Sequence, residues 1–195
     1  MSLMFPTAPA SPSPRLRIAT CSLAGCFGCH MSLLDIDETL ADLVDLITFD
    51  RSPFTDVKAL SEDGIDIGLI EGGLCNEENV EVLRAFRARC RVLVAVGACA
   101  MYGGVPALRN GIPVAELMQT AYLADGLHDP QLPRDPELPP LLDKVLPVHE
   151  VVPVDLTLPG CPPPADAFRA LVLAEIARRT PDIATELPLH ARRFD

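Results

Sequence analysis

Four cysteines of this 195-residue chain lie in three separate turns that are rich in glycine and proline. The turns read Cys26-Phe27-Gly28-Cys29, Gly97-Ala98-Cys99 and Pro159-Gly160-Cys161-Pro162-Pro163. Cysteine thiolates are the usual ligands of iron–sulfur clusters, and four of them gathered from distant loops are typical of a cluster held between loops. The candidate metal ligands are therefore Cys26, Cys29, Cys99 and Cys161.

Three other roles for these cysteines stay open from the sequence alone. Free cysteine is often a small buried hydrophobe, which suits Cys75 and Cys90 better than cysteines in turns. A thioredoxin-like redox pair explains the first turn but leaves the other two turns without a role. Structural zinc also accepts four cysteines, but it usually takes them from two closely spaced pairs, and here Cys99 and Cys161 are separated by 61 residues.

Three further residues are candidates for a role beside the metal. Cys21 lies five residues before the first turn cysteine and is either an extra ligand or a buried neighbour. Glu71 ends an apolar run at 65–70, so it is either a solvated turn carboxylate or a carboxylate near the metal that adjusts charge or relays protons. His30 directly follows the second ligand, and we expect it to be a hydrogen-bond partner and not a ligand.

The apolar pattern predicts strands that alternate with helices. The segment 92–96 is the clearest buried strand, because it is β-branched, uncharged and ended by Gly97. Alternating elements indicate parallel strands joined by right-handed crossovers. We expect an α/β, flavodoxin-like three-layer sandwich with a parallel sheet of about five strands in the order 2-1-3-4-5, which carries the three turns to one edge. The expected strands are 15–20, 44–49, 65–70, 92–96 and 151–156, and the expected helices are 32–43 (with Ser32 as N-cap), 76–89, 114–122 and 164–178.

The length and the proline distribution predict one domain with irregular additions. A chain of 195 residues can bury a core as a single unit. Its 20 prolines are about twice the usual share of roughly 5%. They mark residues 1–14 as an extended N-terminal arm and 123–150 as a Pro-rich surface excursion from a single domain spanning 15–195.

Composition excludes several classes of function. A net charge of −11, no tryptophan and only two tyrosines argue against nucleic-acid binding. No apolar stretch reaches the roughly 18 residues of a membrane span, and no secretory or twin-arginine signal precedes the first strand, so we expect a cytoplasmic protein. In a reducing compartment, seven cysteines favour metal or redox chemistry over disulfides.

Taken in order, the motifs resemble those of the small subunit of nickel–iron hydrogenases. The matching segments are Cys26-x-x-Cys29 with Ser32-Leu33-Leu34, Ile70-Glu71-Gly72, Gly97-x-Cys99-Ala100-x-x-Gly103-Gly104 and Pro159-Gly160-Cys161-Pro162-Pro163. The twin-arginine signal and second cluster-bearing domain of periplasmic enzymes are missing. The chain therefore looks like the small subunit of soluble, bidirectional NAD-reducing hydrogenases.

This resemblance implies a role in electron transfer. Cys26, Cys29, Cys99 and Cys161 would hold one proximal [4Fe–4S] cluster, with Glu71 close to it. The nickel–iron centre would lie in a large subunit, and a diaphorase partner with FMN and further clusters would pass electrons to NAD. The chain alone would have no hydrogenase activity and no catalytic residue.

Other families remain as alternatives. Deazaflavin-reducing and sulfur-reducing hydrogenases have similar small subunits, whereas the complex I-type quinone reductase has two adjacent cysteines at the first turn. From other classes, a zinc-stabilised interaction module and a flavodoxin-like flavin-binding protein stay open. The second would place FMN in this chain, but its first turn holds cysteines in place of a Ser/Thr-rich phosphate loop.

Overall fold

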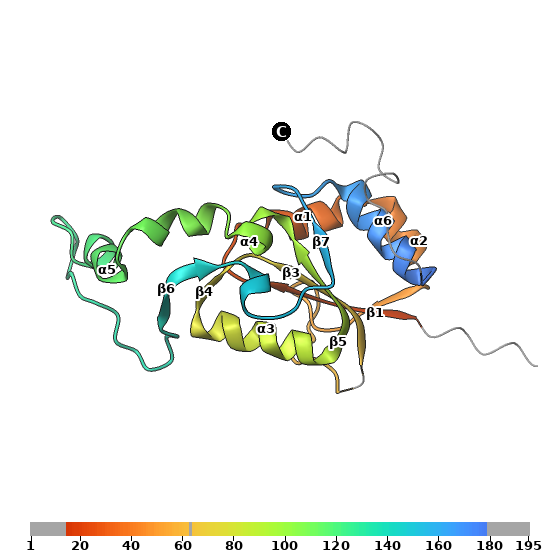
Figure 1. Cartoon of the computed structure of the whole chain (residues 1–195), viewed down its shortest axis with the longest axis horizontal. Helices are drawn as coiled ribbons and strands as arrows, with labels where there is room; N and C mark the ends of the chain where they lie inside the picture. Colours follow the sequence, from red (N-terminus) through yellow and green to blue (C-terminus); the bar gives the residue numbers. More distant parts are fainter. Residues whose placement is uncertain (1–14, 63, 179–195) are drawn as a thin grey trace, which may run out of the picture.

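The computed structural model, which describes residues 15–62 and 64–178, contains a five-stranded parallel sheet (Figure 1). Its order is β2-β1-β3-β5-β7, which is the expected 2-1-3-4-5 when these five strands are numbered along the chain. The predicted α/β three-layer class is therefore confirmed. The strands are β1 (Leu16–Ser22), β2 (Ile47–Phe49), β3 (Ile65–Glu71), β5 (Cys90–Val96) and β7 (Leu156–Leu158).

The three central strands are apolar on both faces because helices cover both sides of the sheet. Ile18 of β1 pairs in register with Ile67 of β3, which pairs in turn with Val92 of β5. Since all these strands are parallel, they end at the same edge of the sheet. The turns that follow β1, β3, β5 and β7 therefore lie together.

Helices pack on the two faces of the sheet and give it two apolar cores (Figure 1). One core includes Val94 of β5 and Phe168 of α6. The other includes Ile70 of β3 and Phe86 of α3. Asn76 caps α3, because its side chain accepts a hydrogen bond from the amide of Asn79 at 2.8 Å. The helices are α1 (Gly28–Leu34), α2 (Glu38–Leu43), α3 (Glu77–Arg89), α4 (Gly97–Tyr102) and α6 (Ala165–Ile176).

A second, smaller group of elements extends from one end of the main sheet. It consists of a two-stranded antiparallel sheet of β4 (Leu74–Asn76) and β6 (Leu141–Leu146), the 3-10 helix η1 (Val105–Gly111) and α5 (Val114–Tyr122). No residue of α5 is buried, and the helix projects from the body (Figure 1). Among residues 15–62 and 64–178, no helix is long and apolar enough to cross a membrane.

The prediction of one helix over 32–43 is wrong, because the chain forms two helices here and the first begins earlier, at Gly28. The chain forms α1 from Gly28 and then, after a turn in which Asp37 has a φ of 54°, the separate α2. Ser32 is therefore not an N-cap but lies inside α1. Its buried hydroxyl donates to the carbonyl of Pro163 at 2.5 Å, which ties α1 to the third cysteine turn.

The predicted fifth strand over 151–156 is also wrong, since only Leu156–Leu158 forms β7. The amides of Val151 and Val152 bond to the carbonyl of Val148 in the short helix η2 (Val148–Glu150), and Pro153 has no amide hydrogen to give to a sheet. The carboxylate of Asp155 instead accepts a hydrogen bond from the amide of Leu93 at 2.7 Å.

The Pro-rich excursion is shorter than predicted. Residues 123–140 form no helix or strand and are mostly exposed, but the chain returns to the body as β6. The side chain of Val145 in β6 is buried, and its backbone is held at both ends by Asn110. The expected arm at 1–14 and the end of the domain beyond 178 lie outside the described residues, so both stay predictions.

Candidate metal centre

Hydrogen bonds hold the three cysteine turns together at the carboxyl edge of the sheet. The turn after β1 is fixed to the end of β3, because the amide of Leu23 donates to the carbonyl of Glu71 at 2.8 Å and Ala24 and Gly73 exchange two hydrogen bonds. The second and third turns are joined by the amide of Ala98, which donates to the carbonyl of Gly160 at 2.9 Å. The hydroxyl of Ser32 in α1, the helix that follows the first turn, donates to the carbonyl of Pro163 in the third turn, so the three turns form one connected unit.

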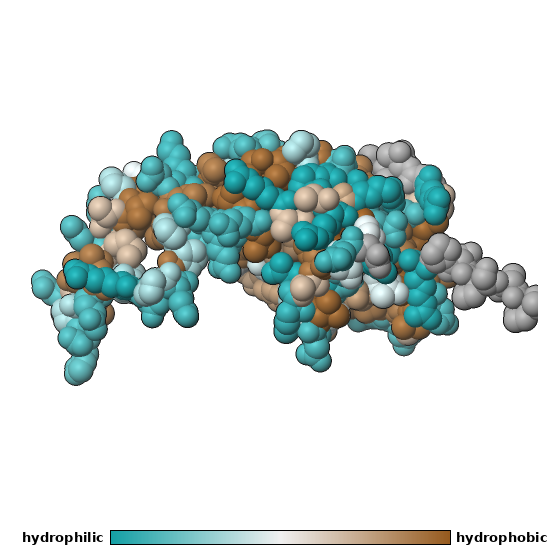
Figure 2. Space-filling view, turned by 90° about the horizontal axis from the view of Figure 1, so that it is seen from below, coloured by the Kyte–Doolittle hydropathy of each residue, from teal (hydrophilic) through white to brown (hydrophobic). Residues whose placement is uncertain are grey.

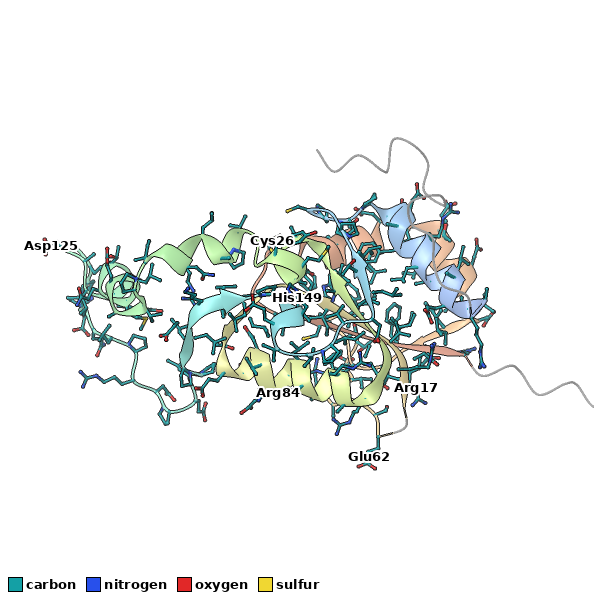
Figure 3. The ribbon with its side chains drawn as sticks, viewed as in Figure 1. Arg17, Cys26, Glu62, Arg84, Asp125 and His149 are labelled. Atoms are coloured by element: carbon teal, nitrogen blue, oxygen red, sulfur yellow. The ribbon has the colours of Figure 1, made fainter. Side chains whose placement is uncertain are left out.

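Cys29 and Cys99 each lie within electrostatic reach of the exposed candidate ligands Cys26 and Cys161. Burial raises the pKa of the Cys29 thiol to about 12, and the Glu71 carboxylate and the other three candidate thiols each raise it further. Burial also raises the pKa of Cys99, with added contributions from Cys161, Cys26 and Glu71. The structure thus brings all four together, with Cys29 and Cys99 partly buried and Cys26 and Cys161 exposed. Figure 3 shows Cys26 beside α1 and α4, away from Arg84 of α3.

Two glycines let the backbone pass close to the thiols. A Cβ atom on Gly97 would lie 2.4 Å from the sulfur of Cys29, and one on Gly104 would lie 2.7 Å from the sulfur of Cys99. Gly97 also has a φ of +78°, which side-chain-bearing residues rarely adopt. The first turns of α4 and η1 can therefore approach the sulfurs only with glycine at these positions.

The donor set fits an iron–sulfur cluster. Four thiolates and a buried carboxylate would repel each other, and a cluster with cationic iron would offset this repulsion. In the described part of the chain, no three His, Cys, Asp or Glu side chains are grouped as one bound metal ion would need. A cluster does not require such convergence, because each cysteine binds a different iron.

Glu71 is a buried carboxylate and not a solvated one. Only 2% of the residue is exposed. Its Oε1 accepts a hydrogen bond from the amide of Cys29 at 3.3 Å, and its Oε2 accepts from the amide of His30 at 3.1 Å and contacts Nδ1 of the His30 ring. The carboxylate is therefore held directly behind a candidate ligand, and the interpretation of Glu71 as a solvated turn carboxylate is wrong. Its role beside a metal stays a prediction.

The remaining cysteines lie apart from this group. Cys21 is buried in the core on the α3 face of the sheet, among residues such as Ile70 and Phe86, and burial raises its pKa to about 11. Cys90 is buried in the same core, as expected for a small hydrophobe. The sulfur of Cys75 lies 3.3 Å from the side-chain oxygen of Asn79. We therefore leave Cys21 out of the proposed ligand set.

The sequence did not predict a role for two buried hydroxyl groups, which extend the contacts of His30 into the body of the protein. Nε2 of His30 lies 3.0 Å from Oγ1 of Thr20, which lies 2.7 Å from Oγ of Ser52. All three residues are buried. No motif links residues that are 32 positions apart, and the only signal available was that Thr20 is a polar residue inside an apolar strand.

Comparisons with known proteins identify the family of the chain. Residues 26–174, more than half of the chain, match the family model of the NADH ubiquinone oxidoreductase 20-kDa subunit. The chain is 40% identical to the NAD-reducing hydrogenase HoxS subunit delta of Cupriavidus necator strain H16, over 98% of this chain and 91% of that protein. It is 35% identical to a subunit of the F420-non-reducing hydrogenase vhu of Methanococcus voltae, over 89% of this chain but only 60% of that protein.

Solved structures give the same relationship. A chain of an NAD⁺-reducing [NiFe]-hydrogenase in the H₂-reduced state superposes with a TM-score of 0.87 at 50% identity, covering 93% of this chain and all of that chain. A [NiFeSe]-hydrogenase chain from Dm. baculatum, at 18% identity and a TM-score of 0.56, shares the fold. The chain therefore belongs to the NADH ubiquinone oxidoreductase 20-kDa subunit family, and within it to the small subunits related to NAD-reducing [NiFe] hydrogenase.

Proposed function

We propose that this chain is the electron-transfer small subunit of a cytoplasmic NAD-reducing [NiFe] hydrogenase. It would hold the proximal [4Fe–4S] cluster between the nickel–iron site of a large subunit and a flavin-containing diaphorase. The observation that carries the proposal is that the turns bearing Cys26, Cys29, Cys99 and Cys161 lie together at one edge of the parallel sheet, joined by hydrogen bonds. Similarity to an NAD-reducing hydrogenase over nearly the whole chain favours NAD as the final acceptor over the alternatives.

The chain's own residues would hold the cluster and set its environment. Bound at these four thiolates, a [4Fe–4S] cluster takes up and releases single electrons. Partial burial of Cys29 and Cys99 limits the access of solvent to their sulfurs, and Gly97 brings backbone close to the sulfur of Cys29. The negative charge of Glu71 opposes the addition of an electron and so lowers the reduction potential. No separate catalytic residue is proposed for this chain.

An exposed apolar surface beside the site supports the proposed partners. Tyr102 of α4 is 70% exposed, and Val105 and Leu108 of η1 are 69% and 78% exposed. Figure 2, which views the molecule from below, shows apolar residues among polar ones on both the body and the projecting segment. Exposed apolar patches of this kind usually mark protein interfaces. Because α4 also carries Cys99, a large subunit seated here would shelter the cluster, and the diaphorase would receive its electrons from the same cluster.

The ligand assignment predicts that Cys99→Ser or Cys161→Ser in the whole complex removes the cluster. Iron content should fall by about four atoms per complex, the number in one cubane, and hydrogen-dependent NAD reduction should be lost. Cys75→Ser is the matched control and should keep both. Full iron content and activity in either ligand variant would contradict the assignment.

The close approach of Gly97 predicts that Gly97→Ala is damaging, although it adds one methyl group. The new Cβ would overlap the sulfur of Cys29, and alanine at positive φ costs about 1–2 kcal/mol. We expect a lower melting temperature and loss of cluster iron. Gly111→Ala, where no atom lies within 4 Å of the added Cβ, should leave both unchanged. Wild-type iron content in Gly97→Ala would argue against a ligand role for Cys29.

The interface assignment predicts that Leu108→Asp weakens assembly with the large subunit. A charge at the centre of a buried apolar contact costs about 2 kcal/mol or more, which is at least a tenfold loss of affinity. Co-purification and titration with the large subunit measure this loss. Leu46→Asp, at an exposed leucine that directly precedes β2, is the control. Unchanged affinity in Leu108→Asp would place the interface elsewhere.

A further inference from the structure

A buried polar chain runs from the cluster site into the body of the protein. The Glu71 carboxylate contacts Nδ1 of His30, Nε2 of His30 lies 3.0 Å from the hydroxyl of Thr20, and that hydroxyl lies 2.7 Å from the hydroxyl of Ser52. Each of the four residues is at most 4% exposed. Both ring nitrogens of His30 are therefore engaged, one toward the site and one toward the core.

The His30 ring also supports the backbone between the first two ligands. Phe27, which separates Cys26 from Gly28, has a φ of 67°, a left-handed conformation that is unfavourable for a non-glycine residue. Its ring stacks on His30 at 4.8 Å between centroids with planes 7° apart, and Phe54 contacts both rings edge-on. Strained backbone persists only where its surroundings hold it, and here the stacked ring supplies that hold.

We propose that His30 is a positioning residue that fixes the first ligand turn and the Glu71 carboxylate relative to the cluster. The His30 ring is itself held by the hydroxyl groups of Thr20 and Ser52, which we call the anchor. This inference rests on the proposed function, since it concerns the same cluster. It extends that function by assigning a role to three residues that bind no iron.

The anchor is rigid because it belongs to the sheet and the loop after β2. The amide of Thr20 in β1 donates to the carbonyl of Arg51 at 2.9 Å, and Oγ of Ser52 accepts from the amide of Phe54 at 3.3 Å. Thr20 itself is 1% exposed. The position of the His30 ring is thus set by β1 and by the loop that follows β2, not by the cysteine turn that it supports.

The hydrogen bond from His30 offsets part of the negative charge of Glu71, so its loss should change the cluster potential. In the whole complex, we measure the midpoint potential of this cluster by redox titration followed by electron paramagnetic resonance. His30→Phe keeps a flat ring for Phe27 but removes both ring nitrogens. We expect a lower midpoint potential in His30→Phe, because the carboxylate charge is less compensated.

A double-mutant cycle tests whether His30 acts through Glu71. Glu71→Gln removes the charge and should raise the midpoint potential. If His30 works by holding this carboxylate, His30→Phe combined with Glu71→Gln should have the midpoint of Glu71→Gln alone. A wild-type midpoint in His30→Phe, or shifts that simply add in the double variant, would overturn the proposal.

The anchor provides a second test that leaves His30 in place. Thr20→Val removes only the hydroxyl and should shift the midpoint in the same direction as His30→Phe but by less, while Thr20→Ser should restore the wild-type value. Thr48→Val on the exposed side of β2 is the control. No shift in Thr20→Val would overturn the anchoring role. A wild-type complex without this cluster signal would instead refute the proposed function.

Discussion

The site depends on the parallel arrangement of the sheet. Strands that run in the same direction end at the same edge, so turns that are far apart in sequence meet without a long loop. Here the turns after β1, β5 and β7 carry the cysteines, and the end of β3 supplies the carboxylate between them. The sheet sets the positions of these turns, and the hydrogen bonds between them make the turns more rigid.

Charge is the main energetic difficulty at this edge. Burial, and after it the neighbouring Glu71 carboxylate, raises the pKa of the Cys29 thiol, so its thiolate is unfavourable here without a bound metal. Bound iron would offset that repulsion, and donors to Glu71 reduce its effect. The thiols of Cys26 and Cys161 and the apolar side chains of η1 are exposed. The proposed large subunit would cover both and exclude water from the site.

The sequence was sufficient for the sheet order and for bringing the four cysteines together, because both follow from alternating strands and helices. It was not sufficient where tertiary contacts override local pattern. Ser32 looked like a helix cap, but its hydroxyl bonds to Pro163, which is 131 residues away. The valines at 151–152 looked like a strand but pack as a 3-10 turn, since Pro153 interrupts the ladder. The link from Glu71 through His30 to Thr20 and Ser52 has no sequence signal, because it depends on side-chain directions across several elements.

The most direct test of the central claim is anomalous X-ray scattering from anaerobically grown crystals of the complex. Data collected above and below the iron absorption edge, with a matching pair at the zinc edge, identify the metal at this site. We predict an iron signal enclosed by the sulfurs of Cys26, Cys29, Cys99 and Cys161 and no zinc signal. A zinc signal there, or iron bound without these four sulfurs, would contradict the account.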